Sequence, residues 1–514
     1  MSDTLRSVIN LDLPGPRISR HLYGHFAEHL GRCIYGGFWV GPESKVPNVR
    51  GIRTDVVEAL RGIGIPNLRW PGGCFADEYH WRDGIGPREN RPQMVNTHWG
   101  NVVEDNSFGT HEFMDLCEQL GAEPYINGNV GSGTVREMSE WVEYLTRNGD
   151  SPMAALRRSN GKDSPWKVPF FGIGNEAWGC GGNMRAEAYA DLASQYSTFV
   201  RDHDGNKICR VAAGADRFDY DWTEALMKVL GCLPCKGDGK HSGPFQAISV
   251  HYYTTLGEFA DKGAATGFGE DEWYKMMASA NKVERLLSRH SDVMNRYDPD
   301  CKIGLVFDEW GAWHNVEEGT NPGFLFQQNT LRDALVASIH FDAFHRHSNR
   351  LIMANIAQTV NVLQSVLLTD EASGQLILTP TYHVFEMNRA HHDALALAIY
   401  AKNALPVRKV GGESIPMVSM SASRQKNSAL ISLSNLDVEE SLAMTIDLRG
   451  VRVKGAHGRI LSAPSIDAHN TAANPVAVAP AQFDGMNLEN GTLNITLPPH
   501  SYLTVSLDLT EESK

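Results

Sequence analysis

The sequence lacks a hydrophobic run long enough to cross a membrane. No stretch approaches the roughly 18 consecutive apolar residues that read as a transmembrane helix, although hydrophobic residues make up 42% of the 514 residues. Residues 1–10 also lack a basic segment followed by an apolar one, which is the pattern of a secretory signal. We therefore expect a soluble protein that has no membrane partner and is located in the cytoplasm.

Positive charge and cysteine are also scarce. Lys and Arg number 47 against 61 Asp and Glu, a net charge of −14. This balance argues against nucleic acid as a partner, because nucleic-acid binding needs clustered cations, whereas a neutral substrate is compatible. Eight cysteines lie scattered without a regular framework and are expected to be reduced thiols. Cys232 and Cys235 form one CxxC pair, which cannot complete a four-ligand zinc site and is interpreted as loop.

Residues 17–385 alternate apolar strands, polar or Gly-rich loops and periodic helices, which is typical of a parallel α/β fold. Helical patterns include residues 110–120, 135–146, 186–203 and 271–294. The strand candidates are 20–28, 65–70, 123–129, 169–176, 208–215, 246–253, 302–309 and 351–358. Eight strands predict a (β/α)8 TIM barrel, and the polar residue that ends each strand would then lie on one rim.

Beyond residue 390 the helical periodicity stops and short alternating runs replace it, as in residues 429–434, 443–448 and 493–497. Such runs predict an all-β sandwich of the jelly-roll type. We assign residues 386–514 to this domain together with residues 1–16, whose lone strand needs a partner sheet.

Two apolar strands deliver a glutamate to the predicted rim. Residues 170–174 lead to Asn175 and Glu176, and residues 303–307 lead to Asp308 and Glu309. A glycosidase needs such a pair, one carboxylic acid to protonate the leaving oxygen and one carboxylate at the anomeric carbon. The structural alternative is that both are solvent contacts at strand ends. Four tryptophans in the same loops could wall a sugar pocket or simply pack: Trp99, Trp178, Trp310 and Trp313.

Five motifs together resemble one enzyme family. They are residues 23–37 (beginning Tyr-Gly-His-Phe-Ala-Glu), 69–76 (Arg-Trp-Pro-Gly-Gly-Cys-Phe-Ala), 174–176 (Gly-Asn-Glu), 307–311 (Phe-Asp-Glu-Trp-Gly) and 379–385 (Thr-Pro-Thr-Tyr-His-Val-Phe). The set resembles the α-L-arabinofuranosidases of glycoside hydrolase family 51 over almost the whole chain. This resemblance implies a retaining exo-enzyme, without metal or cofactor, that releases terminal arabinofuranose from arabinan-type or arabinoxylan-type oligosaccharides. It also implies a homo-oligomer, often a hexamer in this family.

The resemblance assigns roles to single residues. Glu176 corresponds to the general acid/base and Glu309 to the nucleophile, while Arg69 and His251 correspond to residues that orient the two glutamates. Cys74 departs from the Asn that many members carry after Pro-Gly-Gly. The residues that correspond to contacts with the sugar hydroxyls are Glu28, Cys74, Asn175, Tyr253 and Gln358.

Three other functions stay open at this point. Another retaining barrel glycosidase, such as a β-xylosidase or an endo-glucanase, would carry the same paired glutamates, because fold and glutamates do not fix the sugar. A metal-dependent barrel hydrolase is disfavoured, because no HxH or HExxH spacing occurs near the strand ends. A non-catalytic sugar-binding barrel would have no need of both glutamates.

Overall fold

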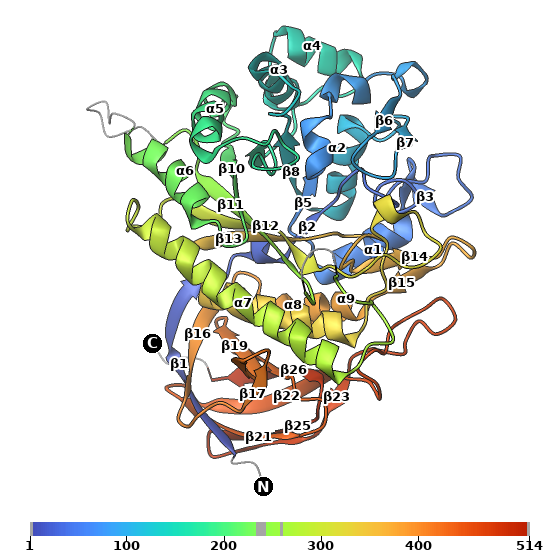
Figure 1. Ribbon diagram of the computed structural model, residues 1–514. Helices are drawn as coiled ribbons and strands as arrows, with labels where there is room; N and C mark the ends of the chain where they lie inside the picture. The colour runs from blue at the N-terminus through green and yellow to red at the C-terminus, as the bar shows by residue number, and fades with distance from the viewer. Residues whose placement is uncertain (1–3, 233–242, 258–260, 511–514) are drawn as a thin grey trace.

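The computed structural model describes residues 4–232, 243–257 and 261–510. Cys235 of the CxxC pair therefore lies outside the described residues. Eight parallel strands close into a barrel (Figure 1), and each overlaps a predicted strand, so the barrel prediction is confirmed. In chain order they are β2 (Gly24–Phe26), β5 (Asn67–Trp70), β8 (Glu123–Gly128), β9 (Phe170–Ile173), β10 (Cys209–Asp216), β11 (Ala247–Thr254), β12 (Gly304–Ala312) and β13 (Leu351–Ile356).

Helices surround the barrel: α1 (Thr54–Ile63), α2 (Thr110–Leu120), α3 (Val135–Thr146), α4 (Pro152–Ser159), α5 (Ala186–Phe199), α6 (Tyr220–Cys232), α7 (Glu270–Asn295), α8 (Leu331–Arg346) and α9 (Pro380–Met387). The predicted bounds of α2 and α3 agree with the structure. Thr134 caps α3, because its hydroxyl accepts a 3.1 Å hydrogen bond from the backbone N–H of Glu137. Helix α5 ends four residues before the predicted His203.

Apolar side chains fill the lower part of the barrel, where Tyr125, Val211, Ala247, Val306 and Met353 form one buried cluster. The upper part is polar, since the carboxyl ends of all eight strands meet at the same rim. Among the described residues, four two-stranded antiparallel sheets lie outside the barrel and the large C-terminal sheet. They pair β3 (Asn48–Val49) with β4 (Ile52–Arg53), β6 (Met94–Asn96) with β7 (Val102–Glu104), β14 (Leu367–Thr369) with β15 (Leu376–Leu378), and β17 (Val407–Val410) with β18 (Glu413–Pro416).

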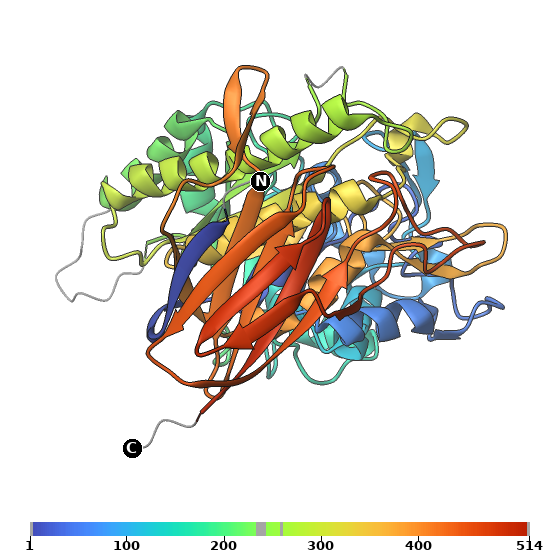
Figure 2. The ribbon, with the colours of Figure 1, turned by 90° about the horizontal axis from the view of Figure 1, so that it is seen from below.

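The C-terminal part is a ten-stranded sheet that curls around its own core (Figure 2). Strand β1 (Leu5–Arg17) lies inside it, antiparallel to β16 (Leu395–Ala401) and parallel to β21 (Leu442–Arg449). The other strands are β19 (Val418–Arg424), β20 (Ser428–Asn435), β22 (Val453–Leu461), β23 (Ala481–Phe483), β24 (Met486–Glu489), β25 (Thr492–Leu497) and β26 (Ser501–Leu509). Ile9, Ile431, Ile446 and Val505 share its core.

Helix α8 joins the barrel to this sheet. The buried carboxylate of Asp342 accepts a 2.5 Å hydrogen bond from the hydroxyl of Ser419 in β19. The buried His345 forms a 2.9 Å hydrogen bond between its Nδ1 and the hydroxyl of Ser421 in the same strand. The ten-stranded sheet therefore packs against the outside of the barrel through α8.

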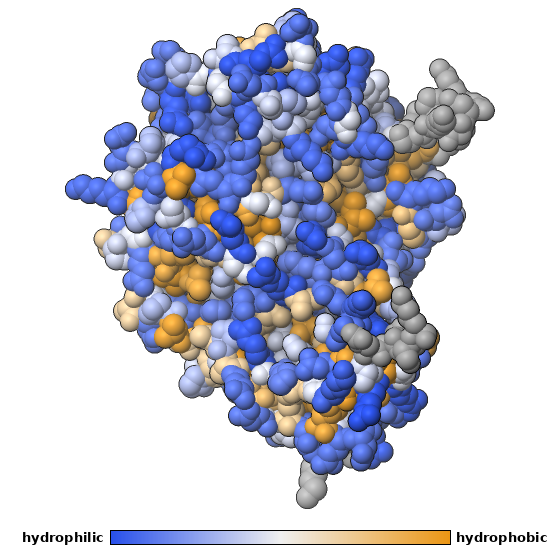
Figure 3. Space-filling model, turned by 180° about the vertical axis from the view of Figure 1, so that it is seen from behind, coloured by the Kyte–Doolittle hydropathy of each residue, from blue (hydrophilic) through white to orange (hydrophobic). Residues whose placement is uncertain are grey.

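The outer surface is largely hydrophilic on the face seen from behind, where apolar side chains form separate small areas (Figure 3). Within the described ranges, no helix combines the length and the apolar character needed to cross a membrane.

Because β1 lies in the middle of the ten-stranded sheet, its inward side chains should stabilise the whole C-terminal part. Ile9→Ala removes a fully buried side chain and should lower the free energy of unfolding by about 2–5 kcal/mol. Leu13→Ala in the same strand is the control, since Leu13 is 65% exposed. Equal thermal unfolding midpoints for the two variants would contradict this placement of β1.

Candidate active site

A small cavity lies at the carboxyl ends of the barrel strands. It is lined by Glu28, Leu30, Gly73, Cys74, Trp99, Asn175, Glu176, Tyr253, Glu309, Trp313, Leu325, Gln358 and Leu363. The strand ends of β2, β5, β9, β11, β12 and β13 thus contribute to one pocket. Both predicted catalytic glutamates and all five predicted sugar-binding residues face it.

A bulge in β12 turns two neighbouring carboxylates into the barrel. Val250 of β11 pairs with Phe307, but the next residue, His251, pairs with Glu309, so Asp308 is an extra residue in the strand. The Asp308 carboxylate accepts hydrogen bonds from Tyr125 and Asn355 inside the barrel, both at 2.8 Å. Glu309 follows directly and faces the cavity.

The buried guanidinium of Arg69 connects the two catalytic strand ends. Its Nη1 donates to Glu309 Oε1 at 2.9 Å, and its Nη2 donates to Asn175 Oδ1 at 2.7 Å. Its Nε lies 3.6 Å from Asp308 Oδ2. Phe26 packs on its face, with the guanidinium carbon 4.6 Å from the ring centre. Arg69 therefore fixes Glu309 and the residue before Glu176 in one network.

His251 bridges the two glutamates. Its Nδ1 lies 2.9 Å from Glu176 Oε1 and 3.6 Å from Glu309 Oε2, and the second oxygen of Glu309 accepts a 2.7 Å hydrogen bond from the Tyr253 hydroxyl. One carboxylate oxygen of Glu176 and one of Glu309 lie within 4.8 Å of each other. A separation of about 5–5.5 Å between carboxyl groups is typical of retaining glycosidases, whereas inverting enzymes need about 6.5–9.5 Å.

The surroundings move the pKa values of the pair in opposite directions. Burial, together with the negative charge of Glu309, raises the pKa of Glu176 despite the hydrogen bond with His251. Burial also opposes the charge of Glu309, but the positive charges of His251 and Arg69 outweigh it and lower the pKa of Glu309. Glu309 is therefore the carboxylate and Glu176 the carboxylic acid at intermediate pH.

Glu28 lines the same cavity and is surrounded by N–H donors. Its Oε1 accepts from the backbone of Gly73 and Phe75 and from Trp99 Nε1, at 3.0–3.1 Å, and its Oε2 accepts from Gln358 Nε2 at 3.0 Å. Burial, followed by the charge of Glu309, raises the pKa of Glu28 to about 7. The glycine at position 73 is required here, since a Cβ would lie 2.9 Å from Glu309 Oε1.

The backbone around Glu176 is tightly constrained. Glu176 has a φ of 37°, in the left-handed region that side chains other than glycine seldom adopt. Its carbonyl accepts from the N–H groups of Gly179 and Gly181, at 2.7 and 3.1 Å. The buried Asp77 carboxylate holds the preceding residue, because its Oδ2 accepts from the backbone N–H of Asn175 at 2.9 Å.

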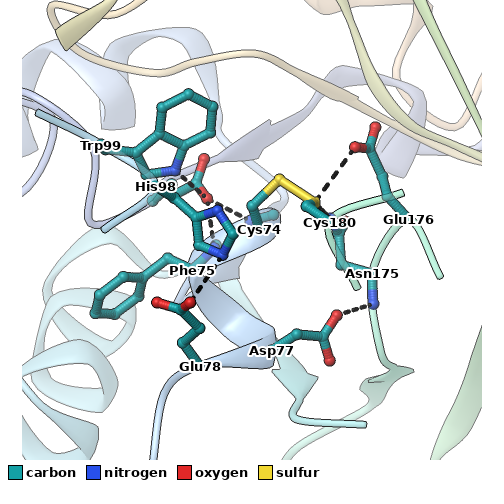
Figure 4. The surroundings of a disulfide bond; sticks show 12 residues. Cys74, Phe75, Asp77, Glu78, His98, Trp99, Asn175, Glu176 and Cys180 are labelled. Carbon is teal, nitrogen blue, oxygen red and sulfur yellow. Dashed lines mark hydrogen bonds and ion pairs between the residues drawn. A yellow bond between two sulfur atoms is a disulfide. The ribbon is translucent and has the colours of Figure 1, made fainter. Parts of the chain in front are cut away.

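A disulfide between Cys74 and Cys180 lies along one wall of the cavity (Figure 4). The expectation of reduced thiols is therefore wrong for these two cysteines, which are 106 residues apart in the sequence. The bond ties the short helix η2 (Cys74–Asp77) to the loop after Glu176, and Cys180 Sγ lies 3.6 Å from Glu176 Oε2. Among the described residues, Cys33, Cys117, Cys209 and Cys301 are free.

The four tryptophans fall into two groups. Trp99 and Trp313 line the cavity. Trp178 instead packs against the neighbouring strand β10, with its Nε1 donating to the carbonyl of Gly214 at 3.1 Å. Trp310 is fully buried outside the barrel and stacks on His340, so the interpretation of Trp310 as a pocket wall is wrong. Successive residues of a strand face opposite sides, and Glu309 takes the inward one.

Sequence reasoning missed several residues that build the cavity. Asp77 is one, and burial raises its pKa to about 7 although three backbone N–H groups bind it. Cys180 is another; it lies between two glycines, four residues after Glu176, and nothing in the sequence pairs it with Cys74. The apolar lining residues Leu30, Leu325 and Leu363 had no distinguishing pattern.

Comparisons with known proteins agree with this geometry. Residues 59–264 match the family described as alpha-L-arabinofuranosidase 1 domain, and residues 308–501 match the alpha-L-arabinofuranosidase C-terminal domain. The intracellular exo-alpha-L-arabinofuranosidase of Bacteroides ovatus is 51% identical over 492 residues, which cover 95% of this chain and 93% of that protein.

Solved structures show the same similarity. The family 51 arabinofuranosidase of Xanthomonas axonopodis pv. citri superposes with a TM-score of 0.93 at 47% identity, covering 98% of this chain and all of that one. The α-L-arabinofuranosidase of Thermotoga maritima, solved as an arabinose complex, gives 0.84 at 30% identity with the same coverage. With both halves of the chain matched and half of its residues identical to an arabinofuranosidase, this chain belongs to the α-L-arabinofuranosidases of glycoside hydrolase family 51.

Proposed function

We propose that this protein hydrolyses terminal, non-reducing α-L-arabinofuranosyl residues of arabinan-type or arabinoxylan-type oligosaccharides by double displacement. The observation that carries the proposal is the pair Glu176 and Glu309, whose oxygens lie within 4.8 Å of each other. The Thermotoga maritima relative was solved with arabinose, which supports a furanose in the corresponding cavity. A β-xylosidase or endo-glucanase is not favoured, because the relatives that share most of this sequence are arabinofuranosidases.

In the first step Glu309 attacks the anomeric carbon while Glu176 gives its proton to the leaving oxygen. Arg69 and Tyr253 hold the two Glu309 oxygens by hydrogen bonds of 2.9 and 2.7 Å, so the attacking carboxylate has one fixed orientation. The product of this step is a glycosyl ester on Glu309 and a free alcohol.

In the second step Glu176, now a carboxylate, takes a proton from water, and the water displaces Glu309 from the anomeric carbon. His251 hydrogen-bonds to Glu176 and supports this change of charge. The two glutamates and water account for every proton and bond in the cycle. Glu28, Asn175 and Gln358 line the same cavity and would bind the sugar hydroxyls.

The disulfide acts as a brace in this scheme. It holds the loop after Glu176 against η2, while Asp77 holds Asn175 from the same helix. Two independent links thus fix the strained residue that must both donate and accept the proton.

The small size of the cavity supports an exo mode of attack, since a pocket accepts a chain end. The name of the Bacteroides ovatus relative includes the word intracellular, which supports a cytoplasmic location for this chain. We also propose a homo-oligomer, a hexamer by analogy with the family.

We expect Glu309→Ala to lose nearly all turnover of activated and natural substrates while keeping substrate binding, because the attacking group is missing. In the wild-type protein, a slow fluorinated arabinosyl substrate should label Glu309, as read by mass spectrometry of peptides. Glu318→Ala, an exposed residue in the loop that follows β12, is the control. A label on any other residue would contradict the assignment of the nucleophile.

Glu176→Ala should affect substrates according to their leaving group. Hydrolysis of an unactivated oligosaccharide should fall by about 10²–10⁴. A p-nitrophenyl arabinoside should still form the glycosyl enzyme and then accumulate it, because no base activates water. Added azide should restore turnover and give a glycosyl azide of retained configuration. Glu187→Ala, exposed at the start of α5, is the control.

The pH profile tests the same assignment. Activity requires ionised Glu309, whose pKa is lowered, and protonated Glu176, whose pKa is raised, so wild-type kcat/KM should follow a bell. On the acid side, activity falls because the glutamate pair gains a second proton and loses the negative charge of the nucleophile. On the alkaline side, activity falls because the pair loses the proton that the leaving oxygen needs. Glu176→Ala should flatten the alkaline limb. An unchanged alkaline limb, with equal losses on both substrates, would rule out Glu176 as the acid/base.

If the disulfide holds Glu176 in place, the double variant Cys74→Ser/Cys180→Ser should have a kcat/KM on p-nitrophenyl α-L-arabinofuranoside about tenfold below the wild type, because small displacements of a catalytic group slow the reaction strongly. Peptide mapping of the unreduced wild-type protein should show the cross-link between positions 74 and 180. Cys301→Ser, which removes a free cysteine, should leave activity unchanged. Wild-type kinetics in the double variant would show that the disulfide does not position Glu176.

A further inference from the structure

A second hollow, which we name the cationic groove, lies beside the catalytic cavity. Its volume is about 490 Å³, and its lining includes Arg217 and Phe218 after β10, Tyr252 and Tyr253 of β11, and Lys275 and Lys282 of α7. The hairpin β17–β18 forms the far wall with Val410, Gly411 and Glu413. Barrel and C-terminal part therefore build this groove together, where α7 crosses the front of the molecule (Figure 1).

The groove and the catalytic cavity are neighbours that share one side chain. Tyr253 lines both hollows, and its hydroxyl donates to the nucleophilic carboxylate of Glu309 at 2.7 Å. A molecule that fills the cavity and extends past Tyr253 would enter the groove.

The order of the barrel strands places the groove on the side of the leaving group. Glu28 and Gln358 follow β2 and β13, whereas the groove begins at the ends of β10 and β11. Strand β10 is the neighbour of β9, which carries Glu176. Since Glu176 protonates the leaving oxygen, the part of the substrate that leaves lies toward the groove and not toward Glu28.

The charge of the groove differs in sign from that of the whole chain, which is −14. Lys275 is exposed and Lys282 half-buried on α7. Arg285 continues the same helix face, three residues on, with its guanidinium 5.2 Å from the centre of the Phe218 ring. Four cationic side chains therefore lie in or beside the groove: Arg217, Lys275, Lys282 and Arg285. Two carboxylates lie near them among the described residues, Glu413 on the far wall and Asp216, whose Oδ1 is 3.5 Å from Arg217 Nε.

Within residues 4–232, 243–257 and 261–510, no carboxylate forms an ion pair with Lys275 or Lys282. Phe218 is half-buried beside Arg285 and lies against Tyr252, with 5.8 Å between the two ring centres. The Tyr252 ring itself is buried, and its hydroxyl donates to the carbonyl of Ser279 at 2.7 Å. One partly accessible aromatic ring and two ammonium groups that pair with no described carboxylate suit a sugar that carries a negative charge.

We propose that the cationic groove is a subsite for a carboxylate-bearing sugar of the uronic acid class, carried by the leaving part of the substrate. This inference rests on the proposed arabinofuranosidase activity and adds a preference to it. The anionic units that plant-type oligosaccharides offer are uronic acids, whose carboxylate would accept hydrogen bonds from Lys275 and Lys282 while the sugar ring packs against Phe218.

The test compares two arabinosylated xylo-oligosaccharides that differ only by a glucuronosyl substituent. At low salt the wild-type protein should have a higher kcat/KM for the charged member. Each exposed ion pair contributes a factor of about two to five, so Lys275→Gln/Lys282→Gln should reduce the preference about fourfold to twenty-fivefold. Sodium chloride at 0.5 M should reduce it similarly in the wild type through screening.

Two variants control for loss of structure. Lys275→Arg/Lys282→Arg keeps both charges and should keep the preference, and Lys454→Gln removes an exposed lysine of β22 in the C-terminal sheet and should also keep it. Equal kcat/KM for both substrates, or an unchanged preference in the Gln variant, would overturn the subsite while the proposed function stands. Failure to release arabinose from the neutral member would overturn the proposed function, and the subsite with it.

Discussion

The ion pair between Arg69 and Glu309 is the interaction on which the site depends. Arg69 is 1% exposed, and a buried guanidinium is stable only where carboxylates and acceptors surround it. Here Glu309, Asp308 and Asn175 supply them, from the ends of β12 and β9. One buried charge therefore sets the relative position of the two strand ends that carry the glutamates, and the closed barrel holds the strands that supply it.

The positive charge of Arg69 also makes the two catalytic glutamates differ in protonation. Two buried glutamates so close together cannot both ionise freely, because like charges in a low dielectric repel. Arg69 and His251 stabilise the anion at Glu309, which leaves burial and repulsion to raise the pKa of Glu176. The acid and the nucleophile thus differ in their neighbours and not in their chemistry. The bulge at Asp308 contributes by adding a second carboxylate on the far side of Arg69.

The barrel and its two glutamates could be predicted because both leave local signals. An apolar strand that stops at a polar residue marks the rim, and the sequences around Glu176 and Glu309 repeat this pattern. The disulfide between Cys74 and Cys180 leaves no such signal, since nothing in the spacing of eight cysteines reveals which two meet. Trp310 shows a second limit: it is next to Glu309 in sequence but on the opposite face of β12, where it packs on His340. Two residues that are adjacent in the sequence can face opposite sides of a strand, and the sequence alone does not show which side faces the cavity.

The central claim is that Glu176 and Glu309 act in succession on one carbon, as their close approach requires. Proton NMR during hydrolysis of an α-L-arabinofuranoside tests it directly, if spectra are taken before the released sugar mutarotates. Two displacements restore the configuration, so the first arabinose to appear should be the α-anomer. If the β-anomer appears first, a single displacement by water has occurred, and the account of Glu309 as a nucleophile is contradicted.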